Sequence, residues 1–234
     1  MKLGIMQPYF FPYIGHFQLI NGVDKFVLLD DVNFKKGGWI NRNKMLLHDE
    51  QFLFTIPLKN ASSFRPLNEL DVDREHYCIW REKFLRTLEH AYKKAPFFNE
   101  VYSLVYDVLH SDFMTIAQLS SNSLYKMCGY LGIATPFVTT STIYHNRELS
   151  TQDRIIDIAM QEHAATYINL SGGAKLYSKE AFRRHGITLK FMISDPIVYD
   201  QWGNGFVPSL SIIDVAMFNS VEATRGFLTS YTYF

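Results

Sequence analysis

Residues 1–31, MKLGIMQPYFFPYIGHFQLINGVDKFVLLDD, decide the fold class of this chain. An apolar run at 3–6 leads into a loop that contains two prolines, and an amphipathic segment follows at 14–20. A second apolar run at 26–29 then ends in two aspartates. This order predicts a strand, a loop, a helix and a second strand, which is the opening unit of an α/β sheet.

The first loop is where we expect a ligand, because open α/β sheets bind ligands outside the carboxyl ends of their strands. It carries four polar or half-polar side chains within ten residues, namely Gln7, Tyr9, Tyr13 and His16. Loop residues of this kind serve function more often than packing.

Length and charge exclude several classes of protein. The chain has 234 residues, 47% of them apolar, and 23 basic residues balance 23 acidic ones. A zero net charge does not favour a nucleic-acid duplex as a partner. No signal segment opens the chain and no apolar run would span a bilayer, so we expect a cytoplasmic protein without membrane insertion. We expect Cys78 and Cys128 to be reduced and buried, outside any zinc-binding spacing.

The middle of the chain, residues 32–134, is expected to be an insert in one domain of 1–234. It begins with a polar loop, and two runs typical of strands follow at 44–47 and 51–58, which predict a hairpin. Apolar residues then recur at helical spacing in three segments. These segments are 80–92, 98–109 and 115–131.

The last hundred residues return to alternating strands and helices. Strands are predicted at 137–140, 166–170 and 188–192, helices at 152–162 and 175–185, and a final helix from about residue 209. We therefore expect an α/β fold of the Rossmann-like (HUP-like) class, with a mainly parallel five-stranded sheet, strand order 3-2-1-4-5 and helices on both faces. The cleft would lie between the insert and the first strand.

His16 is the sharpest single catalytic candidate. Gly15 and His16 open the first helix, and this pair resembles half of the HIGH signature of nucleotidyltransferases, in which helix N–H groups face phosphate. Tyr13 replaces the first histidine of that signature, and no KMSKS-like loop is present. A packing role for His16 is an equal alternative.

Asp30 and Asp31 end the second strand and are the other catalytic candidates. Paired carboxylates bind Mg²⁺ or take a proton from an amine, and aspartates also cap helices and turns. Because neighbouring residues of a strand point to opposite faces, one of the two is expected to reach the site. We expect no tightly bound metal or cofactor, and at most a Mg²⁺ that arrives with phosphate.

Two further loops are candidates for substrate binding. A dense group lies within residues 39–43, in which tryptophan can stack on a ring and arginine can hold phosphate; its members are Trp39, Asn41, Arg42 and Asn43. Ser171, Gly172 and Gly173 separate a predicted strand from a helix, where backbone N–H groups can approach an anion, although an ordinary turn explains them nearly as well.

The chain resembles the WbqC-like protein family of bacteria. The stretches that carry the resemblance, in order, are MQPYFFPYIGHFQLI, VDKFVLLDDVNFKKGGWINRN, FTIPL, AYKKAPFF, YINLSGGAKLY and FVPSLSIIDV. They imply a single WbqC-like domain, and they place Asn169 and Asp214 among the signature positions. His16 departs from the pattern, since many relatives carry an aromatic residue there.

The family is linked to gene clusters for O-antigen and other surface polysaccharides. The resemblance therefore implies a small-molecule nucleotide sugar as the partner. We expect acyl or aminoacyl transfer to the amine of a nucleotide-activated amino sugar, with an acyl or aminoacyl donor as co-substrate. Arg42 would anchor the diphosphate, Trp39 would form the platform, and Asp31 or His16 would take the proton. A non-catalytic sugar-nucleotide or glycan-binding protein and a nucleotidyltransferase-like enzyme are the alternatives.

Overall fold

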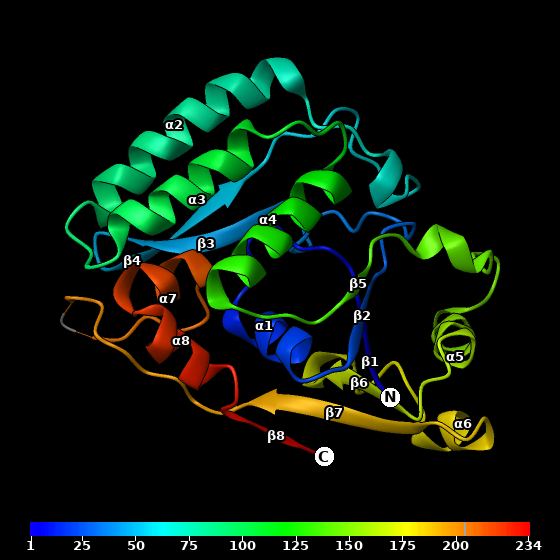
Figure 1. Ribbon diagram of the computed structural model, residues 1–234. Coiled ribbons are helices and arrows are strands. Elements are labelled where there is room, and N and C mark those ends of the chain that lie inside the picture. Colours follow the sequence, from blue (N-terminus) through cyan, green and yellow to red (C-terminus); the bar gives the residue numbers. More distant parts are fainter. Residues whose placement is uncertain (204) are drawn as a thin grey trace.

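A six-stranded sheet forms the centre of the computed structural model, which describes residues 1–203 and 205–234 (Figure 1). Its strands lie in the order β5-β2-β1-β6-β7-β8. The first five of them pair in parallel, so the predicted order 3-2-1-4-5 is confirmed. The strands are β1 (Lys2–Met6), β2 (Lys25–Leu28), β5 (Phe137–Val138), β6 (Thr166–Leu170), β7 (Thr188–Ser194) and β8 (Tyr231–Tyr233).

The sixth strand, β8, corrects the prediction of five strands. It pairs antiparallel with β7, so the sheet is mixed and the Rossmann-like (HUP-like) class is not confirmed. A segment of three residues is too short to show a strand pattern. Gln18 helps to position it, because its Nε2 donates to the carbonyl oxygens of Phe227 at 2.8 Å and Ser230 at 2.9 Å, just before β8 begins.

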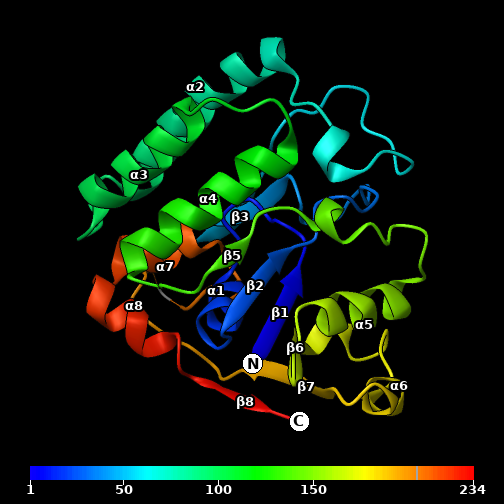
Figure 2. The same ribbon diagram turned by 45° about the vertical axis from the view of Figure 1, so that its right-hand side comes forward.

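Helices cover both faces of the sheet, as predicted (Figure 2). One apolar core joins Ile5 of β1 to α5 and α6, and the other joins Phe26 of β2 to α1, α4 and α7. Alternate residues of a strand enter opposite cores, since Val27 lies in the first core and Phe26 in the second. These helices are α1 (Ile14–Asn21), α4 (Ile116–Leu131), α5 (Thr151–Gln161), α6 (Lys179–Arg184) and α7 (Ile212–Phe218).

The insert between β2 and β5 has the elements that its pattern predicts. The hairpin consists of β3 (Arg42–Leu47) and β4 (Glu50–Thr55), and it packs with α2 (Arg74–Tyr92), α3 (Phe98–His110) and α4 (Figure 1). Thr115 and Gln118 form a capping box at the start of α4, which satisfies backbone N–H groups at the helix end. Short 3₁₀ turns are η1 (Leu67–Glu69), η2 (Ser141–Tyr144) and η3 (Ser171–Gly173).

The expected final helix is two helices, α7 and α8 (Val221–Phe227). Ser220 interrupts the helix, because its hydroxyl caps α8 by accepting from the backbone N–H of Ala223 at 3.1 Å. Cys128 is buried as expected, but Cys78 is exposed on α2, which corrects that prediction. None of the helices in the described ranges is long and apolar enough to cross a membrane.

The first loop is held by hydrogen bonds from three distant parts of the chain. Phe11 has a positive φ of 40°, an unusual conformation for a residue other than glycine. Its N–H donates to Ser123 Oγ at 3.1 Å. Its carbonyl oxygen accepts from Asn43 Nδ2 at 2.6 Å and from Ser211 Oγ at 2.7 Å. The loop is therefore rigid because α4, the hairpin and the start of α7 all hold one residue.

His16 lies inside the core and not at the surface of the first loop. Its side chain is 0% exposed, and its ring packs between Tyr9 at 5.4 Å and Phe26 at 5.9 Å between centroids. Neither ring nitrogen has a hydrogen-bond partner among the described residues. Burial lowers the pKa of His16 to about 3, so the ring is neutral at pH 7. In this structure His16 cannot contact a phosphate, and packing is the role that the contacts support.

The buried imidazole predicts a loss of stability in mild acid. Because the pKa of His16 falls from its ordinary 6.5 to about 3 on folding, the unfolded chain binds a proton that the folded protein does not. The stability that depends on neutral His16 should therefore be fully present above pH 6.5. As the pH falls towards 3, the free energy of unfolding should decrease, by about 2 kcal/mol between pH 8 and pH 5.

Urea unfolding of the wild type and of His16→Phe at pH 8, 7, 6 and 5 measures this loss. The variant keeps an aromatic ring against Tyr9 and Phe26 but cannot titrate, so its stability should fall by about 2 kcal/mol less over the same range. Parallel curves for the two proteins would show that His16 is accessible to protons and would contradict the assignment.

Candidate functional site

An aromatic hollow of about 250 Å³ lies where the first loop meets the hairpin and the C-terminal segment. Its aromatic walls are Tyr9, Tyr13 and Trp39, three of the residues that the sequence predicts for substrate binding. Tyr9 and Tyr13 come from the loop after β1, and Trp39 from the loop before β3. We define the aromatic hollow by its lining residues, Tyr9, Pro12, Tyr13, Trp39, Asn43, Lys44 and Ser209.

Trp39 of the aromatic hollow lies beside two cations, Lys44 of the same lining and Arg42 just outside it. The indole is 45% exposed, although tryptophan is a residue that burial would stabilise. The Arg42 guanidinium lies 5.3 Å and the Lys44 ammonium 5.5 Å from the centre of the indole ring. The flat ring can stack on a sugar or base while the two positive charges beside it bind a phosphate.

The two tyrosines of the aromatic hollow remain protonated at neutral pH. Burial raises the pKa of Tyr9, and burial together with the neighbouring Tyr9 raises the pKa of Tyr13. A phenol that stays protonated can donate one hydrogen bond and accept others. Both rings therefore offer an apolar surface with a polar tip, which suits the hydroxyl groups and apolar faces of a sugar.

A second hollow, of about 380 Å³, adjoins the aromatic hollow because the two share Tyr13 and Ser209 as lining residues. We call it the tail groove, since most of its other lining residues lie between 194 and 210. Among the described residues that line the two hollows, Asp195 carries the one carboxylate. Ser209 has a positive φ of 61°, so the wall between the hollows contains a strained residue.

A buried carboxylate fixes the tail groove from behind. Asp214 is completely buried and accepts hydrogen bonds from Tyr92 Oη at 2.7 Å, Tyr199 Oη at 2.6 Å and Gln201 Nε2 at 2.7 Å. Burial raises the pKa of Asp214, and the three donors lower it in part. This network ties α2 and α7 to the groove residue Tyr199. Its members are spread over the sequence, so residue patterns near Asp214 did not predict its role.

The predicted residues Asn41, Arg42 and Gln7 do not line the aromatic hollow. Asn41 is buried and donates from Nδ2 to the carbonyl oxygen of Ile56 at 2.8 Å, so it joins the loop before the hairpin to the loop after it. Arg42 donates from Nη2 to the carbonyl oxygen of Gly37, where a positive φ of 73° favours glycine. Gln7 is half-buried and directly follows β1.

Asp30 and Asp31 are both buried and engaged in hydrogen bonds. Asp30 Oδ1 accepts from Thr140 Oγ1 and from the backbone N–H of Ser141, each at 2.9 Å. Asp31 pairs with Arg154, whose Nη2 lies 2.6 Å and 2.7 Å from its two carboxylate oxygens. Ser141 Oγ donates to both aspartates. Asp31 lines a separate hollow of about 280 Å³, so neither carboxylate reaches the aromatic hollow.

The glycine loop after β6 lies apart from both hollows. Asn169 is buried and donates from Nδ2 to the hydroxyl of Tyr167. A Cβ on Gly173 would lie 2.5 Å from Asn169 Oδ1, so a close approach of the backbone to this asparagine explains the glycine. Gly172 and Ser171 form the 3₁₀ turn η3 and line none of the hollows described here.

The structure adds Lys44, Ser209 and Asp195 to the candidate site. Lys44 follows the predicted group at 39–43. Alternate residues of a strand share one face, so its position two residues after Arg42 in β3 is the signal that could have indicated it. Ser209 and Asp195 reach the site through tertiary packing alone. Within residues 1–203 and 205–234, no three His, Cys, Asp or Glu side chains gather as they would around a metal ion.

The buried pair of Asp31 and Arg154 should stabilise the fold as a unit. Arg154→Met leaves the Asp31 carboxylate without a partner and should lower the free energy of unfolding by about 3–5 kcal/mol. Arg154→Met combined with Asp31→Leu should recover most of that loss, because it removes both buried charges. Denaturant unfolding of the three proteins measures the effect, and a loss below about 1 kcal/mol for Arg154→Met would leave Asp31 free for other roles.

Comparisons with known proteins agree with the resemblance of the motifs. The model of the WbqC-like protein family matches residues 7–226. The uncharacterized protein Rv1507c of Mycobacterium tuberculosis is 27% identical over 225 residues, which are 95% of this chain and 95% of that protein. No solved structure gives a significant match. Since the family match covers both the first loop and the C-terminal segment that build the aromatic hollow, the chain belongs to the WbqC-like protein family.

Proposed function

We propose that the protein binds a nucleotide-activated amino sugar across the aromatic hollow and the tail groove, and transfers an acyl or aminoacyl group to the sugar amine. The resemblance to proteins of O-antigen and surface-polysaccharide gene clusters supports this class of substrate. The observation that carries the proposal is the exposed indole of Trp39 beside the charges of Arg42 and Lys44.

Each part of such a substrate has a matching group in the two hollows or next to them. The base or sugar ring would stack on Trp39, and the diphosphate would lie against Lys44 and the neighbouring Arg42 guanidinium. The amino group would reach the tail groove, where Asp195 offers a carboxylate. At neutral pH an amino sugar is an ammonium ion, which pairs with a carboxylate before it can react.

Asp195 would replace His16 and Asp31 as the group that takes the proton. Its carboxylate accepts a proton from the ammonium, and the lone pair of the neutral amine attacks the carbonyl carbon of a thioester or aminoacyl ester. A C–N bond forms and the C–S or C–O bond breaks. The leaving thiolate or alkoxide takes up one proton, and the second proton lost by nitrogen passes to solvent.

Non-catalytic binding of the same nucleotide sugar is the second candidate function. It is favoured by the finding that the three predicted catalytic side chains are all buried, His16 without a partner and the two aspartates within hydrogen-bond networks. The two functions share the aromatic hollow and differ in the need for Asp195.

Arg42 variants test whether this arginine contacts the diphosphate. Arg42→Lys keeps the charge but loses the planar fork, so the affinity for UDP-glucosamine should fall roughly tenfold or more, and Arg42→Ala should weaken binding further. Isothermal titration and thermal melts of both variants check this. Lys36→Ala, an exposed charge in the same loop, is the matched control and should bind normally. Unchanged affinity with a lower melting temperature would show that Arg42 stabilises the loop through Gly37 and does not contact the ligand.

Asp195→Asn separates catalysis from binding. If Asp195 takes the proton, amide formation should fall by about a hundredfold or more while UDP-glucosamine still binds. Mass spectrometry of reactions with acyl thioester and aminoacyl ester donors measures the product. Asp112→Asn, an exposed aspartate on the connection between α3 and α4, is the control. Normal product formation by Asp195→Asn would refute its role, and binding without product for every donor would favour the non-catalytic candidate.

A further inference from the structure

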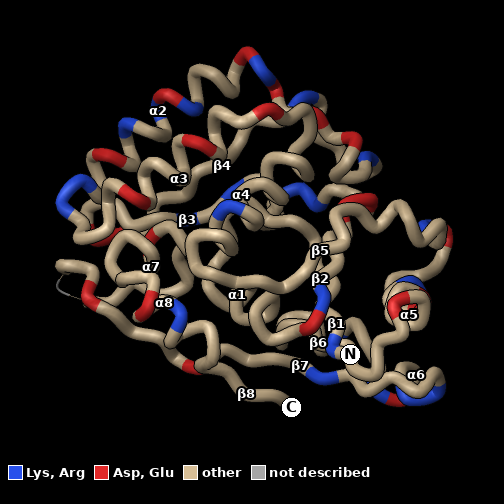
Figure 3. The backbone as a smooth tube through the Cα atoms, viewed as in Figure 1, with Lys and Arg blue, Asp and Glu red and all other residues tan. Residues whose placement is uncertain are grey.

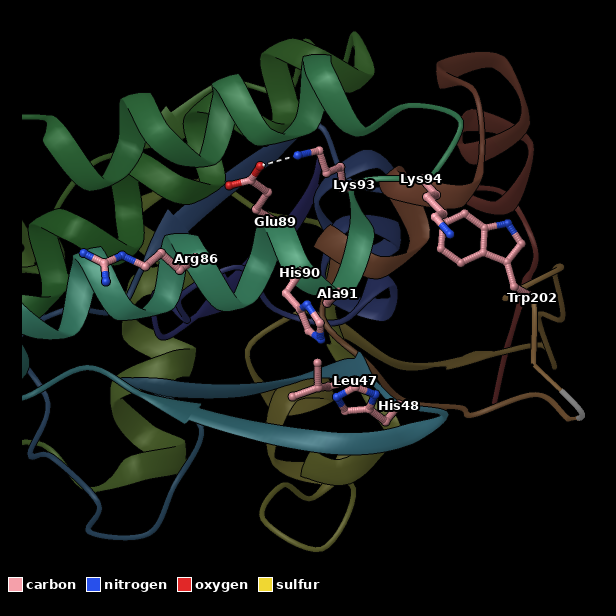
Figure 4. A pocket seen from close by; sticks show the side chains of 9 residues that line it. All are labelled: Leu47, His48, Arg86, Glu89, His90, Ala91, Lys93, Lys94 and Trp202. Carbon is pink, nitrogen blue, oxygen red and sulfur yellow. Dashed lines mark hydrogen bonds and ion pairs between the residues drawn. The ribbon is translucent and has the colours of Figure 1, made fainter.

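A fourth and larger hollow, of about 600 Å³, lies at the other end of the hairpin (Figure 4). It is bounded by the hairpin turn, the C-terminal end of α2 and the loop after Tyr199, and we call it the basic hollow. The lining residues that matter here are His48, Arg86, His90, Lys94 and Trp202. Figure 4 shows the His90 side chain extending from α2 towards the hairpin turn.

The charge of the basic hollow favours an anion. Lys93 and Glu89 neutralise each other at 3.0 Å, whereas no carboxylate pairs with Arg86 or Lys94 among the described residues. Basic residues also gather at the turn between α2 and α3 in Figure 3. Cations near a helix C-terminus are favoured by the helix dipole, which accounts for Lys94 without a ligand. The dipole does not account for Arg86, two turns earlier, or for the aromatic wall.

Strained backbone surrounds the basic hollow. His48 and Asp49 form a two-residue hairpin turn with φ values of 53° and 61°, positions that asparagine and glycine occupy at lower cost. Trp202 also has a positive φ, of 63°. A Cβ on Gly203 would lie 2.9 Å from Asp49 Oδ1, so the loop and the hairpin turn touch at this point. Strain of this kind concentrates at ligand sites, where the surrounding structure maintains it.

The basic hollow also contains aromatic rings. Trp202 is 50% exposed and its indole meets Phe218 edge to face at 4.8 Å between centroids, which fixes the ring but leaves part of it open. The rings of His48 and His90 lie 5.3 Å apart, and each has an N–H group that can donate to an anionic oxygen.

We propose that the basic hollow is a second ligand site that binds a nucleoside phosphate. The phosphates lie against Arg86, Lys94 and the two histidines, and the base stacks on Trp202. This site is separate from the aromatic hollow, because the two share no lining residue. The inference goes beyond the proposed function and does not depend on it.

Isothermal titration with ADP, inorganic pyrophosphate and adenosine tests the proposal on the full chain. ADP should bind more tightly than pyrophosphate, and adenosine should bind most weakly. The double variant Arg86→Gln with Lys94→Gln should bind ADP at least tenfold more weakly than the wild type. Added salt should reduce its affinity for ADP less than it reduces that of the wild type. Trp202→Leu should lower the affinity for ADP but not the affinity for pyrophosphate. Lys83→Gln with Lys126→Gln, which removes two exposed charges elsewhere, should bind as the wild type does.

Trp39→Leu distinguishes the basic hollow from the aromatic hollow. ADP should bind this variant normally if its site is the basic hollow. Loss of ADP binding in Trp39→Leu, with full binding by the variant of Arg86 and Lys94, would assign ADP to the aromatic hollow and overturn the proposal. No ADP binding to the wild type at millimolar concentration would also overturn it. Neither result would bear on the Asp195 experiment, which uses a different substrate and readout.

Discussion

The carbonyl oxygen of Phe11 is the point on which the architecture of the aromatic hollow depends. It accepts one hydrogen bond from the hairpin, through Asn43, and one from the start of α7, through Ser211. Both donors are buried, so breaking either hydrogen bond would leave a buried donor group without its partner. The first loop, the hairpin and the C-terminal segment are thus held in one arrangement by a single backbone group with a positive φ.

The same arrangement explains why the two hollows lie next to each other. Asn43 positions β3, so that Lys44 points towards the loop that carries Trp39. Ser211 positions the segment before α7, so that Ser209 separates the aromatic hollow from the tail groove. Asp214, one turn further along α7, holds Tyr199 on the far wall of that groove. Buried polar groups thus hold the first loop, the hairpin and the C-terminal segment in place behind the exposed side chains of the candidate site.

Local patterns were sufficient for much of the fold. The apolar runs at 3–6 and 166–170 and the helical spacing around α5 predicted the parallel strands in their correct order, because these signals depend on neighbouring residues. Strand β8 was missed because three residues carry no period. What fixes its place is a pair of hydrogen bonds from Gln18, more than two hundred residues earlier.

The site was less predictable, for the same reason. Tyr9, Tyr13 and Trp39 line the aromatic hollow, and the sequence predicts them as candidates because polar and aromatic groups in loops are local signals. The burial of His16 depends on Phe26 and on the core around it, and the partner of Asp31 is Arg154, 123 residues away. The residues next to the histidine and the aspartate in the sequence indicate neither the burial nor the distant partner. The catalytic assignments could therefore not be made from sequence alone.

Parallel pairing of β1 with β6 also sets the order in which the chain can complete its fold during synthesis. Lys2 pairs with Thr166, and the carbonyl oxygen of Phe11 in the first loop accepts a hydrogen bond from Ser211, which is synthesised much later. A nascent chain can form the hairpin and helices of the insert early, since their contacts are local. One edge of β1 stays unpaired until β6 emerges from the ribosome, and the aromatic hollow closes only when the last helices have been made. Interrupted synthesis therefore yields a chain with a folded insert, an open strand edge that invites aggregation, and no binding site.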